Sequence, residues 1–226
     1  MIFVKILAVS DLHGSNIPEL HSYLKNNRVD IIVVAGDITH FGPPELAEEL
    51  LNDLASHKIP VVAVPGNCDP HGIASRIENS RAINIHARTL SVKDVAFCGL
   101  GGSNPTPFNT PLELGEDEIR SVLDKLLENL KGNDRLILVT HAPPHGTGVD
   151  RIPSGDNVGS TGVRDVIEKH QPCINICGHI HESPGVESLG ETLIVNPGQL
   201  SEGRAALIEI DDDGSVRAEI LNLKSS

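Results

Sequence analysis

Residues 31–67 read IIVVAGDITHFGPPELAEELLNDLASHKIPVVAVPGN, in which two apolar runs flank a longer amphipathic segment. The runs IIVVA and VVAV consist of β-branched residues and alanine, which is typical of buried strands. The segment between them has leucines at the spacing of one helix face, namely Leu46, Leu50, Leu51 and Leu54. A strand, a helix and a second strand in this order predict a parallel strand pair in an α/β fold.

The same alternation extends over most of the chain. Further strands are expected at residues 3–11, 95–102, 135–141 and 173–179. Helices are expected at 16–27, with Asn16 as the N-cap and Pro18 in the first turn, and at 116–132 and 161–171. The inward face of the helix at 116–132 is expected to comprise Ile119, Val122, Leu123, Leu126, Leu127 and Leu130.

The tail of the chain has a different pattern. Residues 192–198, 204–211 and 216–223 alternate apolar and polar side chains across turn signals such as DDDGS. This alternation predicts an antiparallel meander with one solvated face. We therefore expect a mostly parallel α/β core that the tail extends or covers. The sequence shows no linker, repeat or low-complexity segment, so residues 1–226 are expected to form a single domain.

Composition and charge disfavour a nucleic-acid partner. Hydrophobic residues make up 39% of the chain and charged residues 22%, as in ordinary globular proteins. The formal net charge is −13, from 18 Lys and Arg against 31 Asp and Glu, whereas phosphate backbones are bound mainly by basic side chains. With no Trp and one Tyr, the chain also lacks the aromatic residues of a base-stacking platform.

The cysteines and the apolar runs indicate a cytoplasmic protein. The four cysteines show no Cys-x-x-Cys spacing and lie mostly in apolar runs, so we expect buried thiols rather than disulfides at Cys68, Cys98, Cys173 and Cys177. No segment approaches the ~20 apolar residues of a membrane span, and the first apolar run is short and broken by Lys5. We therefore expect no membrane partner.

Polar side chains follow five of the expected strands where each strand ends. They are Asp11 and His13 in SDLHG, Asp37 in AGD, Asn67 in PGNCD, His141, and His179 and His181 in GHIH. Any one of them alone is more often a helix cap, a turn former or a solvated side chain. Strands of an open α/β sheet present ligand sites at their carboxyl ends, so together these residues indicate a metal site.

The number of candidate ligands predicts two cations rather than one. A tetrahedral ion takes about four protein ligands, whereas two cations ~3.5–4 Å apart can share a bridging carboxylate. His179 and His181 stand at i and i+2. In an extended segment both imidazoles would leave the strand end on the same side and could contact a metal or a phosphate.

In the order D-x-H, G-D, G-N, lone His and G-H-x-H, these residues resemble the calcineurin-like metallophosphoesterases. The blocks span Asp11 to His181, and the stretches THAPPHGTGVD, GHIHES and NPG look most like a prokaryotic branch of small phosphoesterases in that family. The resemblance implies a four-layer αββα fold, in which two mixed sheets pack as a sandwich flanked by helices. It also implies hydrolysis of a small phosphate ester by attack of a metal-bridging hydroxide, with Asp37 and Asn67 in the catalytic centre.

The resemblance also implies the metal ligands. One cation would be held by Asp11, His13, Asp37 and His181, and the other by Asp37, Asn67, His141 and His179. Manganese is the first choice by resemblance, and iron, zinc, cobalt and nickel remain open because imidazole, amide and carboxylate ligands suit them all.

One residue departs from the commonest family pattern. Many members have a histidine after the asparagine that is thought to protonate the leaving group, whereas this chain has Cys68. A thiol is a weak proton donor to an alkoxide, so we expect phosphodiesters rather than monoesters as substrates. The structural alternative is that Cys68 is a packed thiol. His145, four residues beyond His141, is a candidate for the missing acid and equally plausible as a loop histidine.

Other functions remain as alternatives. They include a phosphomonoesterase of the same mechanism and a non-catalytic scaffold of the same fold, although a scaffold would be expected to have lost ligands. A protein serine/threonine phosphatase is disfavoured because GDITHFG lacks the arginine of that group, and a repair nuclease because of the acidic charge. The remaining histidines are expected at the surface or at helix ends, and a homo-oligomer is left open.

Overall fold

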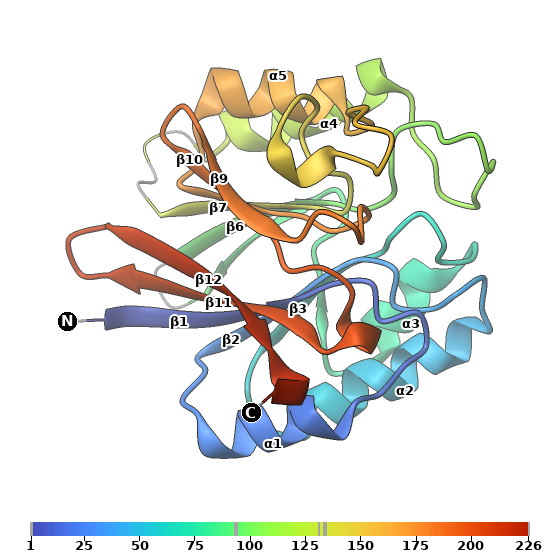
Figure 1. Cartoon of the computed structure of the whole chain (residues 1–226), viewed down its shortest axis with the longest axis vertical. Helices are drawn as coiled ribbons and strands as arrows, with labels where there is room; N and C mark the ends of the chain where they lie inside the picture. Colours follow the sequence, from blue (N-terminus) through green and yellow to red (C-terminus); the bar gives the residue numbers. More distant parts are fainter. Residues whose placement is uncertain (1, 93–94, 131, 133–134, 226) are drawn as a thin grey trace.

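Apolar runs form strands and amphipathic segments form helices in the computed structural model, which describes residues 2–92, 95–130, 132 and 135–225. Within these residues the strands form two six-stranded mixed sheets that pack face to face, with helices on both outer faces (Figure 1). The layers are therefore α/β/β/α, which confirms the fold implied by the family resemblance.

The first sheet has the strand order β12–β11–β1–β2–β3–β4. Its strands are β1 (Ile2–Val9), β2 (Ile31–Ala35), β3 (Val61–Val64), β4 (Ile83–Asn84), β11 (Arg204–Asp211) and β12 (Val216–Asn222). Strands β1 to β4 are parallel neighbours, and the pairing of β2 with β3 is the parallel pair that residues 31–67 predicted. Strand β11 pairs antiparallel with β1, and β12 pairs antiparallel with β11.

The second sheet has the strand order β5–β6–β7–β8–β10–β9. Its strands are β5 (Arg88–Val92), β6 (Val95–Leu100), β7 (Leu136–Thr140), β8 (Ile174–Ile176), β9 (Gly185–Leu189) and β10 (Thr192–Asn196). The central four are parallel, and the edge strands β5 and β9 pair antiparallel.

Three helices cover the first sheet and two cover the second (Figure 1), counted over the described part of the chain. They are α1 (Pro18–Asn26), α2 (Pro44–Ala55) and α3 (Ile73–Asn79) on one side, and α4 (Glu116–Glu128) and α5 (Thr161–His170) on the other. Short 3-10 turns lie at Gly148–Asp150, Leu200–Glu202 and Leu223–Ser225. None of the helices in these residues combines the length and the apolar composition needed to cross a bilayer.

Helix packing follows the predicted apolar faces. Helix α2 buries Leu50, Leu51 and Leu54 against the first sheet, and Leu46 packs beside them partly buried. The predicted inward residues of α4 all pack on the second sheet, with Ile119, Leu123 and Leu127 buried and Val122, Leu126 and Leu130 partly so. Lys131, in the expected helix at 116–132, lies outside the described residues. Between the sheets, buried aliphatic side chains and Phe97 fill the space and fix the two sheets against each other.

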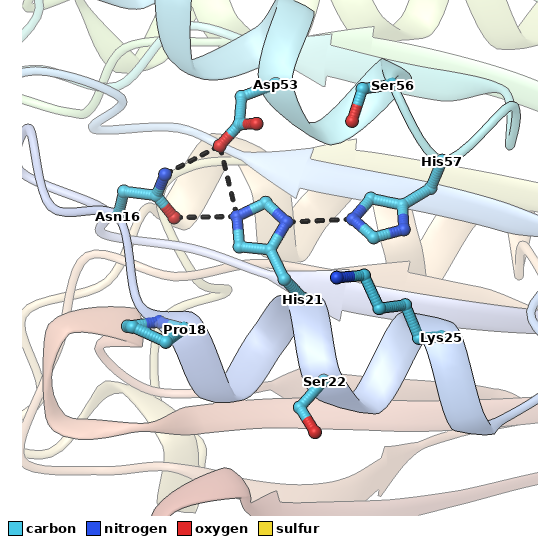
Figure 2. Close-up of a pocket in the computed structure, with 8 residues that line it drawn as sticks. All are labelled: Asn16, Pro18, His21, Ser22, Lys25, Asp53, Ser56 and His57. Carbon is cyan, nitrogen blue, oxygen red and sulfur yellow. Dashed lines mark hydrogen bonds and ion pairs between the residues drawn. The ribbon is translucent and has the colours of Figure 1, made fainter.

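Asn16 does not cap α1, contrary to the prediction. The residue in the N-cap position is Ile17, which makes no side-chain capping bond. Asn16 lies instead in a surface pocket between α1 and α2, where its amide donates to Asp53 at 2.6 Å and its carbonyl oxygen lies 2.7 Å from Nε2 of His21 (Figure 2). Because these contacts occupy the side chain, it does not bond the first turn of the helix.

The predicted meander of the tail was wrong. Strand β10 belongs to the second sheet, where it pairs parallel with β8 and antiparallel with β9. Of the three predicted tail strands, β11 and β12 pair with each other as a hairpin, which extends the first sheet beyond β1. Alternation along a strand predicts which face is buried, but it does not predict which strand is the neighbour.

Candidate metal centre

The strand ends that were expected to meet come from both sheets. Asp11 and His13 follow β1, Asp37 follows β2 and Asn67 follows β3 in the first sheet. His141 follows β7, and His179 and His181 follow β8, in the second sheet. The structure brings all seven side chains together, at the carboxyl edges of two sheets rather than one.

Four of these seven residues have left-handed backbone conformations. The φ angles are 55° at Asp11, 47° at His13, 48° at Asp37 and 70° at His179. Each such conformation costs an L-residue roughly 1–2 kcal/mol. Backbone strain of this kind is concentrated at functional sites, because the surrounding structure must hold it in place.

Backbone contacts hold these turns together. The amide of Asp11 donates to the carbonyl of Gly36 at 3.0 Å, and the amide of His13 donates to the carbonyl of Asp37 at 2.9 Å. Gly178 lets the second sheet approach closely, because a Cβ there would collide with Ser10 and with the carboxylate of Asp11. The loops after β1 and β2 are therefore bonded backbone to backbone, and the loop after β8 packs on the side chains of Ser10 and Asp11.

One group of donors surrounds the carboxylate of Asp11. Nε2 of His181 lies 3.1 Å from Asp11 Oδ1 and 3.2 Å from Nε2 of His13. Asp11 Oδ1 is fully buried, and its contact with His181 is an ion pair that lacks good hydrogen-bond geometry. A buried carboxylate oxygen without a well-directed hydrogen bond is costly in free energy, so the imidazole nitrogens beside it fit a cation.

A second group of donors surrounds His141, which is fully buried. Its Nδ1 lies 2.8 Å from the carbonyl of Ala35, which can only accept, so Nδ1 carries a proton. Its Nε2 faces Asn67 Oδ1 at 2.9 Å and Asp37 Oδ1 at 3.4 Å, and its ring centroid is 5.1 Å from that of His179. Imidazoles that bind metals are commonly oriented by such a bond from the other ring nitrogen.

Asp37 lies between the two groups. Its Oδ1 faces His141, whereas its Oδ2 lies 3.8 Å from Nε2 of His13. The backbone amide of Cys68 donates to Oδ1 at 2.8 Å and fixes the carboxylate plane. Gly66 leaves room for this arrangement, since a Cβ there would collide with the carboxylate of Asp37.

The pKa values of these groups are shifted by burial and by each other. Burial alone would raise the pKa of Asp37, but His141 and His13 hold it below its usual range, so the carboxylate is ionised. Burial opposes protonation of His141, yet Asp37 raises the pKa of His141 to about 9. Burial and the neighbouring His141 lower the pKa of His179 to about 4. The cluster therefore combines a charged carboxylate with a neutral imidazole, His179, as a cation site requires.

The imidazoles of His179 and His181 lie in different donor groups because a turn separates them, whereas an extended segment was expected. Strand β8 ends at Ile176, and the left-handed turn at His179 places that imidazole beside His141. His181 lies instead beside Asp11 and His13. The pair was expected to leave an extended segment on one side, but a turn separates the two rings.

A cavity of about 610 Å³ opens onto these donors. Its lining includes five of the predicted ligands, namely His13, Asp37, Asn67, His179 and His181, while Asp11 and His141 are buried behind it. It also includes Ser15, His40, Phe41, Cys68, Phe108, Thr110, Gln199 and Ser201. The volume lies within the range of small-molecule sites.

Two neighbouring residues were missed from the sequence. His40 lines the cavity, and its Nδ1 lies 3.3 Å from Nδ1 of His13. Asp69 is buried and accepts the amides of Ile38, Thr39 and Gly66, so it ties the loops after β2 and β3 together. The signal that could have found them is their proximity to the motifs: His40 ends the stretch GDITH, which contains Asp37, and Asp69 ends the stretch GNCD, which contains Asn67.

Cys68 and His145 lie in different places. Burial and the charge of Asp37 raise the pKa of the Cys68 thiol, so the group lining the cavity is a neutral thiol. His145 is absent from the residues that line the cavity within the described chain, and 42% of its side chain is exposed. Its Nδ1 lies 3.7 Å from Asp150 Oδ2.

Two known proteins are similar to this chain in sequence over most of its length. Uncharacterized protein MJ1162 of Methanocaldococcus jannaschii is 37% identical over 218 residues, which cover 93% of this chain and 97% of that protein. UPF0046 protein K07C11.7 of Caenorhabditis elegans is 27% identical over 222 residues, which cover 89% of this chain and 71% of that protein.

Solved structures share the fold at lower identity. The crystal structure of TT1561 of Thermus thermophilus matches with a TM-score of 0.77 at 20% identity, covering 99% of this chain and 100% of that chain. A dimetal phosphatase from Danio rerio matches with a TM-score of 0.67 at 13% identity, with coverage of 99% and 100%.

The family model described as calcineurin-like phosphoesterase matches residues 4–183, a span that includes both donor groups. The chain therefore belongs to the calcineurin-like phosphoesterases, a family of metal-dependent hydrolases that act on phosphoesters.

Proposed function

We propose that this protein hydrolyses phosphodiester bonds of small phosphate esters with two divalent cations. The observation that carries the proposal is the position of Asp37, which turns one carboxylate oxygen toward each donor group. The carboxylate of Asp11 supports it, because its buried Oδ1 accepts no well-directed hydrogen bond and lies beside the imidazole of His181, where a cation would stabilise it.

The proposed ligand sets follow the two groups. One cation is assigned to Asp11, His13, Asp37 and His181, and the other to Asp37, Asn67, His141 and His179. When bound, such cations lower the pKa of water and neutralise charge on the phosphoryl oxygens.

The residues around the ligands orient them for this role. Thr110 Oγ1 accepts a hydrogen bond from the Asn67 amide at 3.0 Å, so Asn67 Oδ1 faces His141. The carbonyl of Ala35 accepts the Nδ1 proton of His141, which directs Nε2 of that ring to the same point. His40 Nδ1 lies beside Nδ1 of His13, and the other ring nitrogen of His13, Nε2, faces Asp11.

Manganese is our first proposal for the metal. The choice follows the family resemblance, and none of the proposed ligands is a thiolate that would favour a soft metal. The donors are carboxylate, amide and imidazole, and iron, zinc, cobalt and nickel are the competing metals.

Phosphodiesters are proposed over monoesters because of the residue beside Asn67. A neutral thiol with a raised pKa assists an alkoxide leaving group poorly. Two imidazoles are candidates for the proton donor: His40, which lines the cavity, and His145, the loop histidine. A phosphomonoesterase of the same mechanism is the second candidate function, because the donor groups serve either ester.

The test is a metal-supplemented assay. The protein is stripped with a chelator, reloaded with each metal in turn, and given bis(p-nitrophenyl) phosphate, p-nitrophenyl phosphate and an oligonucleotide. We expect metal-dependent diester hydrolysis that exceeds monoester hydrolysis, and little action on the oligonucleotide because of the acidic net charge. Faster monoester hydrolysis would establish the second candidate, and inactivity with every metal would favour a scaffold.

A further inference from the structure

Two exposed phenylalanines flank the proposed metal centre. Among the described residues, the exposed large hydrophobic side chains are Phe41 at 54%, Ile83 at 37%, Phe108 at 80% and Val186 at 38%. Both phenylalanines line the cavity that holds the predicted ligands. The whole chain has four Phe, and two of them line this one cavity.

Phe41 is held there at a cost. Its φ angle is 61°, a left-handed conformation that is a genuine outlier for a bulky residue. Its amide donates to the carbonyl of Cys68 at 3.0 Å, which fixes the backbone to the loop after β3. Its ring meets that of His40 edge to face, with centroids 4.7 Å apart. The ring is therefore oriented at the cavity although more than half of it is exposed.

Phe108 belongs to a loop that is bonded to the site. Thr110 Oγ1 accepts from Asn67, and Oγ1 of both Thr106 and Thr110 donates to Glu113 at 2.6 Å. The amide of Phe108 itself donates to Thr106 Oγ1 at 3.2 Å. These bonds fix the loop in place, yet they leave its largest apolar side chain in solvent.

The cavity has a polar part and an apolar part. The proposed ligands occupy the first, and a phosphoryl group fills only a portion of about 610 Å³. The rings of Phe41 and Phe108 supply the apolar lining. Aromatic rings in offset-stacked or edge-to-face contact gain free energy beyond that of area burial, which an aliphatic group of similar size does not supply.

We infer that the substrate carries a planar aromatic ring, aryl group or nucleobase, which packs on Phe41 and Phe108 while its phosphoryl group lies at the ligand cluster. This inference rests on the proposed function and adds the class of organic group. An exposed phenyl pair could also contact a second copy of the chain, and the experiment includes that outcome.

The experiment measures binding, so it does not depend on turnover. Methylphosphonate, cyclohexylphosphonate, phenylphosphonate and adenosine 5′-monophosphate are titrated calorimetrically into the manganese-loaded protein. We expect phenylphosphonate to bind at least about fivefold tighter than methylphosphonate and tighter than cyclohexylphosphonate, in the range of aromatic stacking. Tighter binding of the nucleotide than of phenylphosphonate would assign the ring to a nucleobase, and the reverse to a smaller aryl group.

Variants test whether Phe41 and Phe108 cause the preference for phenylphosphonate over methylphosphonate. Phe41→Ala and Phe108→Ala should each reduce the phenyl-to-methyl affinity ratio, whereas Val186→Ala, which removes an exposed apolar side chain on β9, should not. Equal ratios in all four proteins would overturn the inference. So would a Phe108→Ala variant that changes sedimentation and leaves the ratio intact, because the rings would then form a contact between copies.

The two proposals fail differently. If no phosphonate binds and bis(p-nitrophenyl) phosphate is not hydrolysed by the metal-loaded protein, the proposed function fails. If hydrolysis occurs but methylphosphonate, or cyclohexylphosphonate, binds as tightly as phenylphosphonate, only the aromatic ring is overturned.

Discussion

At the scale of single residues, Asp37 is the carboxylate that each donor group shares. Its φ of 48° turns it into the space between the sheets, and the amide of Cys68 holds its Oδ1. We expect Asp37→Asn to lose most of its metal and to be at least about 100-fold less active, since loss even of outer-shell partners costs 10–100-fold.

Elemental analysis on the purified variant checks this expectation. Asp117→Asn is the matched control, because it makes the same substitution at an exposed site on α4. Two ions per chain in Asp37→Asn would show that Asp37 does not bridge.

Cys68 is predicted to limit protonation of the leaving group. Because its thiol pKa is raised, we expect rates on aryl phosphodiesters to depend steeply on leaving-group pKa. Cys68→His should flatten that dependence, provided that metal content is unchanged, since a larger ring could displace Asn67. A shallow dependence in the unmodified protein would mean that another acid acts, and His40→Ala and His145→Ala would identify it.

The metal ligands predicted from the sequence lie at the ends of strands, whereas the residues that were missed lie within loops. Asp11, Asp37 and His141 end long apolar runs, so their position was readable from the pattern. His40 was expected at the surface or at a helix end because it matches none of the motifs. Its contact with His13 depends on the turn of the loop after β2, and no spacing along the sequence encodes that turn.

At the scale of elements, Asp69 holds the loops after β2 and β3 together. Its carboxylate accepts amides from both loops, at 3.1 Å from Ile38, 2.7 Å from Thr39 and 2.8 Å from Gly66. Burial, with the charge of Asp37, raises the pKa of Asp69 to about 6. Because backbone amides occupy both of its carboxylate oxygens, we assign Asp69 a positioning role rather than that of a ligand.

We expect Asp69→Asn to lower the free energy of unfolding by about 2 kcal/mol, because hydrogen bonds to charged groups contribute about 1.5–3 kcal/mol. For a chain of this size that corresponds to a fall in Tm of roughly 4–8 °C. Thermal unfolding followed by circular dichroism measures it, with Asp117→Asn as the control. An unchanged Tm would mean that the two loops are held by other contacts.

Most of the elements found from the sequence have several apolar positions at a regular spacing, although the three-residue strand β8 was also predicted. Helices α2 and α4 and strands β1, β2, β3, β6 and β7 have enough apolar positions to show their period. Helix α3 has seven residues and β4 two, too few for a period to be visible. Strand β9 is mostly exposed and carries little apolar signal.

At the scale of the whole molecule, the apolar layer between the sheets ties the two halves of the metal centre together. Side chains from β1, β2 and β3 pack there against side chains from β6, β7 and β8. The sequence predicted one sheet edge. Only the family resemblance implied two sheets, because strand partners far apart in the chain leave no local signal.

Residues 1–226 are proposed to unfold as one domain. If so, Tyr23 fluorescence, which reports on α1 beside the first sheet, and circular dichroism, which reports on both sheets, should give the same denaturant midpoint. Two separated transitions would show that the sheets belong to independent units.

The central claim is that two cations share Asp37 between the sheets. Anomalous diffraction from crystals of the manganese-loaded protein tests it most directly. The account predicts two peaks ~3.5–4 Å apart, with Asp37 contacting both, His181 on one and His179 on the other. A single peak, or both imidazoles on the same ion, would contradict it.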